Sequence, residues 1–140
     1  MSANSPNPNH GFSQRWFDEV WNKQREAAID ELRHTGARAY GFPSPSSSLS
    51  HEEFKEAYRQ FNRAFSNIHV TIDEEVVEGD HVACRWTATV THTGDALGFP
   101  ATQQRVSFSG SAFMHMRDGK LHDAWNFFDF TAVIKQLQGN

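Results

Sequence analysis

The spacing of apolar residues changes at Asn67, and this change fixes the order in which helices and strands can follow one another. Before Asn67, apolar side chains recur every three or four residues, which is typical of helices with one buried face. After it they alternate with polar side chains, which is typical of strands with one buried face. The alternation predicts four strands, which run from Ile68 to a turn at Glu78–Asp80, then over Val82–Val90, Val106–Met116 and Lys120–Phe128.

The helical part is predicted to begin near Ser13 and to form two short helices or one bent helix, ended by Gly36. An extended segment at residues 37–42 and a loop at 43–50 follow, and then Ser50 and Glu53 form a capping-box pattern that starts a third helix. Asp118-Gly119 predicts a tight hairpin between the last two strands. The apolar positions of the helices, including a short closing one, are Trp16, Phe17, Val20, Trp21; Ala28, Ile29, Leu32; Phe54, Ala57, Tyr58, Phe61, Phe65; and Val133, Ile134, Leu137.

Helices first, then a strand meander, then one helix indicate an α+β fold whose antiparallel sheet is covered on one face by the helices. A chain of 140 residues is long enough for one core and too short for two. Residues 1–12 are rich in Ser, Asn and Pro, which predicts a disordered tail before a single domain at residues 13–140.

Charge and hydropathy exclude several classes of partner. The 13 basic and 17 acidic residues give a net charge of −4, which argues against nucleic acid and against membrane surfaces as partners. No apolar run is long enough to span a bilayer, and the first residues lack the pattern of a secretory signal, so we expect a cytoplasmic protein. The single Cys84 lies in a predicted strand and is expected to be a buried structural thiol.

The two faces of the predicted sheet differ in what they must contact. One face carries Phe108, Gly110, Ala112, Met114 and Met116 and is expected to meet the helices, with the small residues giving either tight packing or a cavity. The other carries Phe113, Trp125 and Phe127, which need a second cover. A homodimer packed sheet to sheet would supply it. Alternatively, the sheet curls and these rings meet the terminal segments.

Several strings of the chain resemble the SnoaL-like polyketide cyclase (ester cyclase) family of the NTF2-like superfamily. They are IHVTIDEEVVEGD from Ile68, the run from His81 to Gly110, and DGKLHDAWNFFDFTAVIKQLQ from Asp118, and the resemblance covers roughly residues 13–138. The most specific pieces are Arg85-Trp86-Thr87, His92-Thr93-Gly94, Gly98 with Pro100, Asp118-Gly119-Lys120, Trp125-Asn126-x-x-Asp129 and Gln136-Leu137.

The resemblance implies a cone: a strongly curved antiparallel sheet wrapped around N-terminal helices, with an apolar pocket inside and dimerisation through the sheet. It also implies intramolecular aldol condensation without metal or organic cofactor. The family's acid/base Asp falls on Asn126, and its pocket Gln and His fall on Gly110 and Ala112. An amide can orient a carbonyl or stabilise an enolate but cannot carry the proton.

The site expected from the sequence therefore combines Asn126 with a pocket for a small, flat carbonyl compound. Asp129 is either a second catalytic residue or the cap of the last helix. His92, His115 and His122 are expected at the surface or an interface, and no metal-ligand spacing is present. The alternative functions are a non-catalytic ligand-binding or dimerisation module, or another NTF2-like hydrolase, dehydratase or isomerase. The expected pocket residues are Trp16, Phe17, Tyr40, Trp86, Phe108, Gly110, Ala112, Met114 and Phe128.

Overall fold

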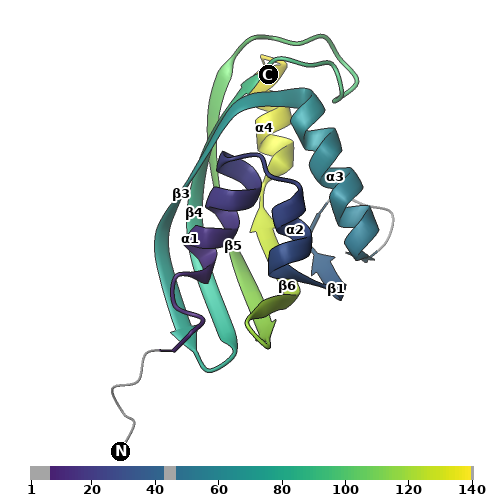
Figure 1. Cartoon of the computed structure of the whole chain (residues 1–140). Coiled ribbons are helices and arrows are strands. Elements are labelled where there is room, and N and C mark those ends of the chain that lie inside the picture. The colour runs from purple at the N-terminus through teal and green to yellow at the C-terminus, as the bar shows by residue number, and fades with distance from the viewer. Residues whose placement is uncertain (1–6, 43–46, 140) are drawn as a thin grey trace, which may run out of the picture.

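The computed structural model describes residues 7–42 and 47–139, and in this part of the chain the expected α+β class is confirmed. One six-stranded sheet has the order β2-β1-β6-β5-β4-β3, and α1, α2 and α3 lie on the same side of it (Figure 1). The elements are α1 (Phe12–Trp16), the π-helical segment η1 (Phe17–Asn22), α2 (Ala27–Leu32), β1 (Arg33–Tyr40), β2 (Ser48–Leu49), α3 (His51–Ala64), β3 (Phe65–Glu78), β4 (His81–His92), β5 (Arg105–Arg117), β6 (Lys120–Phe128) and α4 (Phe130–Leu137).

The four strands expected from the alternation are present as β3 to β6, each antiparallel to the next. Asp118 and Gly119 both have positive φ, 52° and 77°, as the expected hairpin turn requires. The capping box of α3 is complete: the Ser50 side chain accepts from the Glu53 N–H, and the Glu53 side chain accepts from the Ser50 N–H. Local sequence patterns therefore specify most of the sheet and its longest helix.

The first strand differs from the expectation. The second helix ends at Leu32, and Gly36 lies inside β1, which pairs in parallel with β6 and makes the sheet mixed. Ala37 and Ala39 are buried on β1, and their small side chains let the strand pack closely. Because β1 lacks large alternating apolar residues, periodicity identifies only the extended part from Ala37 onward. Of the expected loop at 43–50, residues 43–46 lie outside the described residues, and the remainder contains the short strand β2.

The expected tail also differs in its second half. Residues 1–6 lie outside the described residues, but Asn7 and Asn9 donate side-chain hydrogen bonds to the Gly79 carbonyl at 2.9 Å, and Phe12 is buried. The helical region after them is one continuous pair, α1 and η1, followed by the separate α2. The amide nitrogens of Gly11 and Ser13 donate to the Glu75 carboxylate on β3, which anchors the start of α1 to the sheet.

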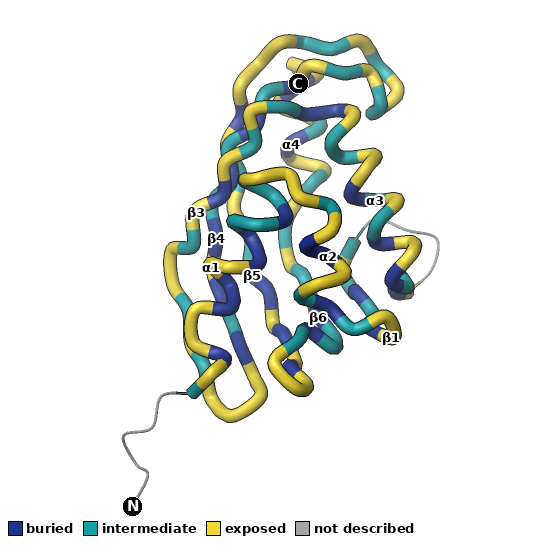
Figure 2. Tube along the Cα trace, in the orientation of Figure 1, coloured by how far each residue is buried: buried dark blue, intermediate teal, exposed yellow. Residues whose placement is uncertain are grey.

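The core lies between the helices and the inner face of the sheet, and along β4 buried residues alternate with more exposed ones that face outward (Figure 2). Cys84 is buried there, as expected, and burial raises the pKa of its thiol. None of the helices at residues 7–42 and 47–139 is long and apolar enough to cross a membrane. A location in the cytoplasm stays a prediction.

Candidate active site

A cavity of about 340 Å³ lies between the N-terminal helices, α3 and the inner face of the sheet. Its lining is almost entirely apolar and aromatic, which matches the usual character of small-molecule sites. Besides the residues discussed below, side chains from every layer contribute: Trp21, Ala39, Phe42, Phe54, Ala57, Gln60, Phe61, Ile68, Val70, Ala88, Val90, Leu97, Leu121, Ala124 and Phe130.

Most of the expected pocket residues line this cavity, and two do not. Tyr40 stacks on Trp125 on the outer face of the sheet, with ring centroids 5.1 Å apart and planes within 6°, so its expected place in the pocket is wrong. Gly110 packs tightly instead of opening space, because a β-carbon there would collide with the Trp86 indole. The expected residues that do line the cavity are Trp16, Phe17, Trp86, Phe108, Ala112, Met114 and Phe128.

Asn126 lines the cavity, as the alternation along β6 predicts. Its Nδ2 donates to the Tyr40 carbonyl at 3.0 Å. Since a carbonyl can only accept, this bond also fixes which amide atom is nitrogen. The approach of the two strands is close: Gly41 has φ 94°, and a β-carbon there would collide with the Asn126 backbone. The Asn126 side chain is thus held in one orientation, with Oδ1 left as an acceptor.

Asp129 lies outside the cavity lining. It is the N-cap residue of α4, and its Oδ1 accepts from the Ala132 N–H at 3.1 Å. A carboxylate at this position satisfies one of the free amides at the start of the helix and interacts favourably with the helix dipole. This geometry agrees with the capping alternative for Asp129 and does not place it as a second catalytic group.

Arg33 is a cavity residue that the sequence reasoning missed. Its side chain is only 2% exposed, and its guanidinium lies over the Phe54 ring at 4.8 Å. Nη1 donates to His51 Nδ1 at 2.8 Å, and Nη2 reaches the Ala37 carbonyl at 3.5 Å. Burial lowers the pKa of Arg33 to about 10, although the nearby charge of Asp123 acts in the opposite direction.

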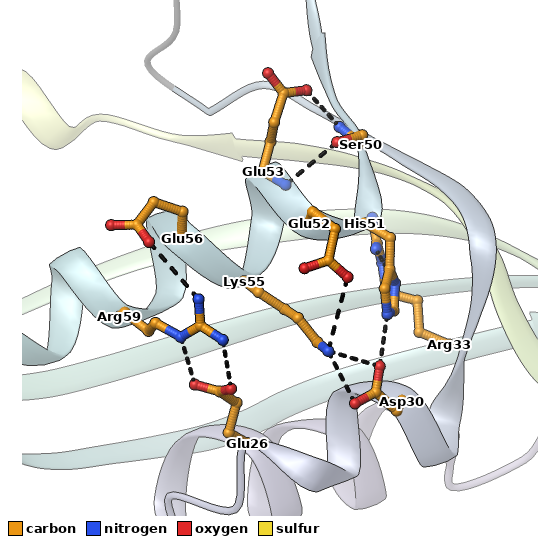
Figure 3. A network of polar contacts seen from close by, with 10 residues as sticks. All are labelled: Glu26, Asp30, Arg33, Ser50, His51, Glu52, Glu53, Lys55, Glu56 and Arg59. Carbon is orange, nitrogen blue, oxygen red and sulfur yellow. Dashed lines mark hydrogen bonds and ion pairs between the residues drawn. The ribbon is translucent and has the colours of Figure 1, made fainter.

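Behind Arg33, a polar chain runs to the surface (Figure 3). His51 accepts from Arg33 through Nδ1, so its Nε2 carries the proton and donates to Asp30 Oδ1 at 2.8 Å. Lys55 pairs with the same carboxylate at 2.8 Å. The hydrogen bonds from His51 and then Lys55 lower the pKa of the Asp30 carboxyl. The chain joins α2, β1 and α3 beneath the cavity wall.

Tyr58 and Trp86 also bring polar atoms to the lining. The Tyr58 hydroxyl donates to the Val20 carbonyl at 2.8 Å, and burial raises its pKa. The Trp86 side chain is 7% exposed, and its buried Nε1–H has no acceptor among the described residues. The lining contains no Asp, Glu, His, Lys or Cys side chain within the described part of the chain.

Of the three histidines expected at the surface or an interface, one is buried in the structure. His92 is completely buried, against the expectation of a surface position, because its ring packs on Phe65 and Phe99 and its Nδ1 accepts from the Thr102 N–H at 3.1 Å. His115 is exposed and His122 is half-buried. Over residues 7–42 and 47–139, no group of three or more His, Cys, Asp or Glu side chains is arranged to hold a metal ion.

Comparisons with known proteins agree with the fold and with the resemblance in the sequence. The family profile described as SnoaL-like polyketide cyclase matches residues 13–137. A candidate SnoaL-like polyketide cyclase from Jannaschia sp. CCS1 superposes with a TM-score of 0.83 at 23% identity, covering 95% of this chain and 93% of that one. A candidate polyketide cyclase from Acidithiobacillus ferrooxidans gives 0.79 at 24% identity over 99% of both chains.

A third similar structure was solved in the presence of a small molecule. TerC, which was co-crystallised with polyporic acid, gives a TM-score of 0.74 at 16% identity, covering 94% of this chain and 99% of that one. A comparison with curated protein sequences gave no match. Similarity to solved structures at these identities shows a shared NTF2-like fold, and the profile match covers most of the chain.

Proposed function

This chain belongs to the SnoaL-like polyketide cyclase family, and we propose that it binds a small, flat, weakly polar carbonyl compound and promotes its cofactor-independent aldol-type cyclisation or a related proton transfer. The observation that supports this proposal most is the cavity of about 340 Å³, with its aromatic walls and few polar groups. This volume lies within the range of small-molecule sites. Rings such as Trp16, Phe17 and Phe128 offer faces on which a planar ligand can stack.

Asn126 is the polar group best placed to act on such a ligand. In an aldol ring closure, a proton leaves a carbon between two carbonyls, the resulting enolate attacks another carbonyl of the same molecule, and the new alkoxide takes up a proton. A fixed amide can hold an enol hydroxyl at Oδ1 or stabilise an enolate through its second Nδ2–H. The bond from Nδ2 to the Tyr40 carbonyl keeps the side chain in place before the ligand arrives.

General-base catalysis is the contribution that the lining lacks. A positioned base typically contributes about 10²- to 10⁴-fold to such a step. Since no carboxylate or imidazole lines the described part of the cavity, we expect cyclisation by this chain to be slow. The same observation favours a second candidate function, a non-catalytic ligand-binding module. That module would bind the same compounds without converting them.

The variant Asn126→Asp separates the two functions. It introduces a carboxylate into an apolar cavity, where desolvation raises its pKa toward neutrality and makes it able to take up a proton. We expect it to accelerate cyclisation of aromatic polyketide esters relative to the wild type, followed by product chromatography. Gln136→Asp, which adds the same charge at an exposed position of α4, away from the cavity and the outer face of the sheet, is the control. Ligand binding without any gain in turnover would favour the binding module.

The proposal includes a homodimer formed through the outer face of the sheet. Phe113 and Phe127 are 55% and 53% exposed there, and their rings contact each other at a centroid distance of 6.1 Å. Exposed aromatic patches of this kind usually belong to interfaces. The partners proposed for this chain are thus a small molecule and a second copy of itself.

A further inference from the structure

We propose that Arg33 forms an anion-binding subsite at one end of the cavity, and that the natural ligand carries a carboxylate, phenolate or enolate oxygen that binds its guanidinium. This inference rests on the proposed function, because it concerns the ligand of the same cavity. It adds a charged group to a ligand that the apolar walls alone would describe as neutral.

The position of Arg33 places the charge at the end of the cavity near the β5–β6 hairpin. Arg33 begins β1, where it pairs with Leu121, and Leu121 follows the turn at Asp118-Gly119 closely. Both Leu121 and Phe54, over whose ring the guanidinium lies, belong to the cavity lining. Other lining residues, such as Leu97 and Phe130, come from the loop after β4 and from α4. A bound anion would therefore orient the ligand along the cavity.

The charge of Arg33 has no direct counter-ion among the described residues. Its close partner is the neutral imidazole of His51, and the Asp30 carboxylate is reached only through that ring. Asp123 is the other nearby carboxylate, but its oxygens accept from the Arg38 N–H and contact His122. A buried cation without a paired anion is unfavourable. A ligand anion in the cavity would remove that cost.

The guanidinium also has donors to spare. It carries five N–H groups, and two of them point to described acceptors, His51 Nδ1 and the Ala37 carbonyl, which leaves three. Free donors on a planar guanidinium match the two oxygens of a carboxylate, and charge-assisted bonds of this type are the strong ones. His51 acts as a positioning residue, because its acceptor nitrogen fixes one N–H of Nη1, and one N–H each on Nη1, Nη2 and Nε stays free.

Trp86 adds a second polar side chain to the lining, at a distance from Arg33. The Nε1–H of Trp86 is buried and lacks an acceptor among residues 7–42 and 47–139. Buried donors are almost always paired in native proteins, with protein, water or ligand. Trp86 lies on β4 and Arg33 on β1, three strands apart in the sheet. A ligand with an anionic oxygen at Arg33 would lay its rings against the Trp86 side of the lining.

The first test compares a carboxylate with its neutral ester in the wild-type chain. Binding of 2-naphthoate and of methyl 2-naphthoate is measured by quenching of tryptophan fluorescence at pH 7. We expect the acid to bind about 10-fold more tightly, or better. A second probe covers phenolate and enolate ligands: binding is expected to lower the apparent pKa of 4-nitrophenol, seen as phenolate absorbance. The arm that responds identifies the source of the anionic oxygen, and a response in neither arm overturns the proposal.

Variants then assign the effect to Arg33. Arg33→Met should abolish the preference for the acid while the ester still binds, and Arg33→Lys should retain part of it. Arg38→Met removes a guanidinium that is bonded to Ser48 and is not part of the lining, so it should leave the preference unchanged. Acid preference that survives Arg33→Met contradicts the assignment. If none of the three probe compounds binds the wild type, the proposed function itself fails, whereas equal binding of acid and ester together with an unchanged apparent pKa of 4-nitrophenol overturns only the role of Arg33.

Discussion

The charge of Arg33 is held inside the protein by one neutral side chain, and this makes His51 a sensitive position. His51→Leu removes the acceptor of Arg33 Nη1 and the donor to Asp30 while leaving the cation buried. We expect a loss of about 1–3 kcal/mol in the free energy of unfolding, because a buried donor then lacks its partner. Urea denaturation at pH 7 measures it.

The double variant Arg33→Met/His51→Leu is the matched control for this effect. Replacing both polar partners by apolar groups of similar size is often close to neutral. The double variant should therefore be more stable than His51→Leu alone. If the two variants lose the same free energy of unfolding, the unpaired charge of Arg33 is not the cause of the loss. The changed packing around α3 is then the cause.

For single residues, the sequence predicts which strand side chains face the cavity, because apolar and polar residues alternate along a strand. Asn126, Ala112 and Met114 are assigned to the cavity because each lies on the inner parity of its strand. Arg33 and His51 lie at the junction of α2 with β1 and at the start of α3, where neither period holds. They come together only because β1 pairs with β6 and α3 packs over β1, which no local pattern encodes. Tyr40 lies outside the cavity, against the expectation from the sequence, because the same pairing decides which way β1 faces.

The start of α1 depends on a carboxylate that comes from a different element. Glu75 of β3 accepts from the amide nitrogens of Gly11 and Ser13, whereas Gly11 itself has no capping side chain. Burial acts to raise the pKa of Glu75, but the hydrogen bonds from Ser13 and Gly11 outweigh it and lower the pKa overall. Glu75→Gln keeps one acceptor oxygen and loses the charge, so it should cost about 1 kcal/mol of unfolding free energy at pH 7.

The pH dependence of this variant has a definite sign. A carboxyl whose folded pKa is lowered stabilises the fold fully above its unfolded pKa of about 4.3 and loses that contribution as the pH falls through the folded value. The difference between wild type and Glu75→Gln should therefore shrink on going from pH 7 to pH 3. Glu74→Gln, whose partner Arg85 is on the surface, should cost less than about 0.5 kcal/mol at either pH. A pH-independent difference would contradict the role given to the Glu75 charge.

The last helix provides a separate test of Asp129. Asp129→Ala removes the acceptor for the Ala132 N–H and should cost about 1 kcal/mol in thermal or urea unfolding. Asp129→Asn keeps a capping oxygen and should retain both stability and ligand binding. If the asparagine variant is as stable as the wild type but loses ligand binding or turnover, Asp129 acts at the site and the capping role is not its main one.

Among the elements, strands β3 to β6 and helix α3 were predictable, because long alternation, a capping box and an Asp-Gly turn are local signals. The missed elements are short. β2 has two residues, and β1 has the sequence RHTGARAY, whose burial depends on its neighbour in the sheet. The resemblance to a known family supplied the cone and the pocket, whereas the parallel pairing of β1 required the structure.

The whole molecule has one face of its sheet covered and one open. Helices cover the inner side. The outer side carries a row of residues in register across β3, β4, β5, β6 and β1, which are in that order Val76, Ala83, Phe113, Trp125 and Tyr40. The middle of the row is Phe113 and Trp125, with the Tyr40 ring stacked on Trp125. Val76, at the β3 end of the row, is 60% exposed.

This row and the adjacent Phe127 make the sheet-to-sheet homodimer testable. We expect light scattering at micromolar concentration to give twice the chain mass of 15.9 kDa. Phe113→Glu should shift the species to the monomer mass, because burying an unpaired carboxylate at an apolar contact is strongly unfavourable. Gln136→Glu, which adds the same charge on an exposed position of α4, should leave the dimer intact. A wild-type chain that scatters as a monomer would contradict the homodimer and mean that the aromatic row is open to solvent. The cavity lies on the opposite face of the sheet and would then bind its ligand without a partner chain.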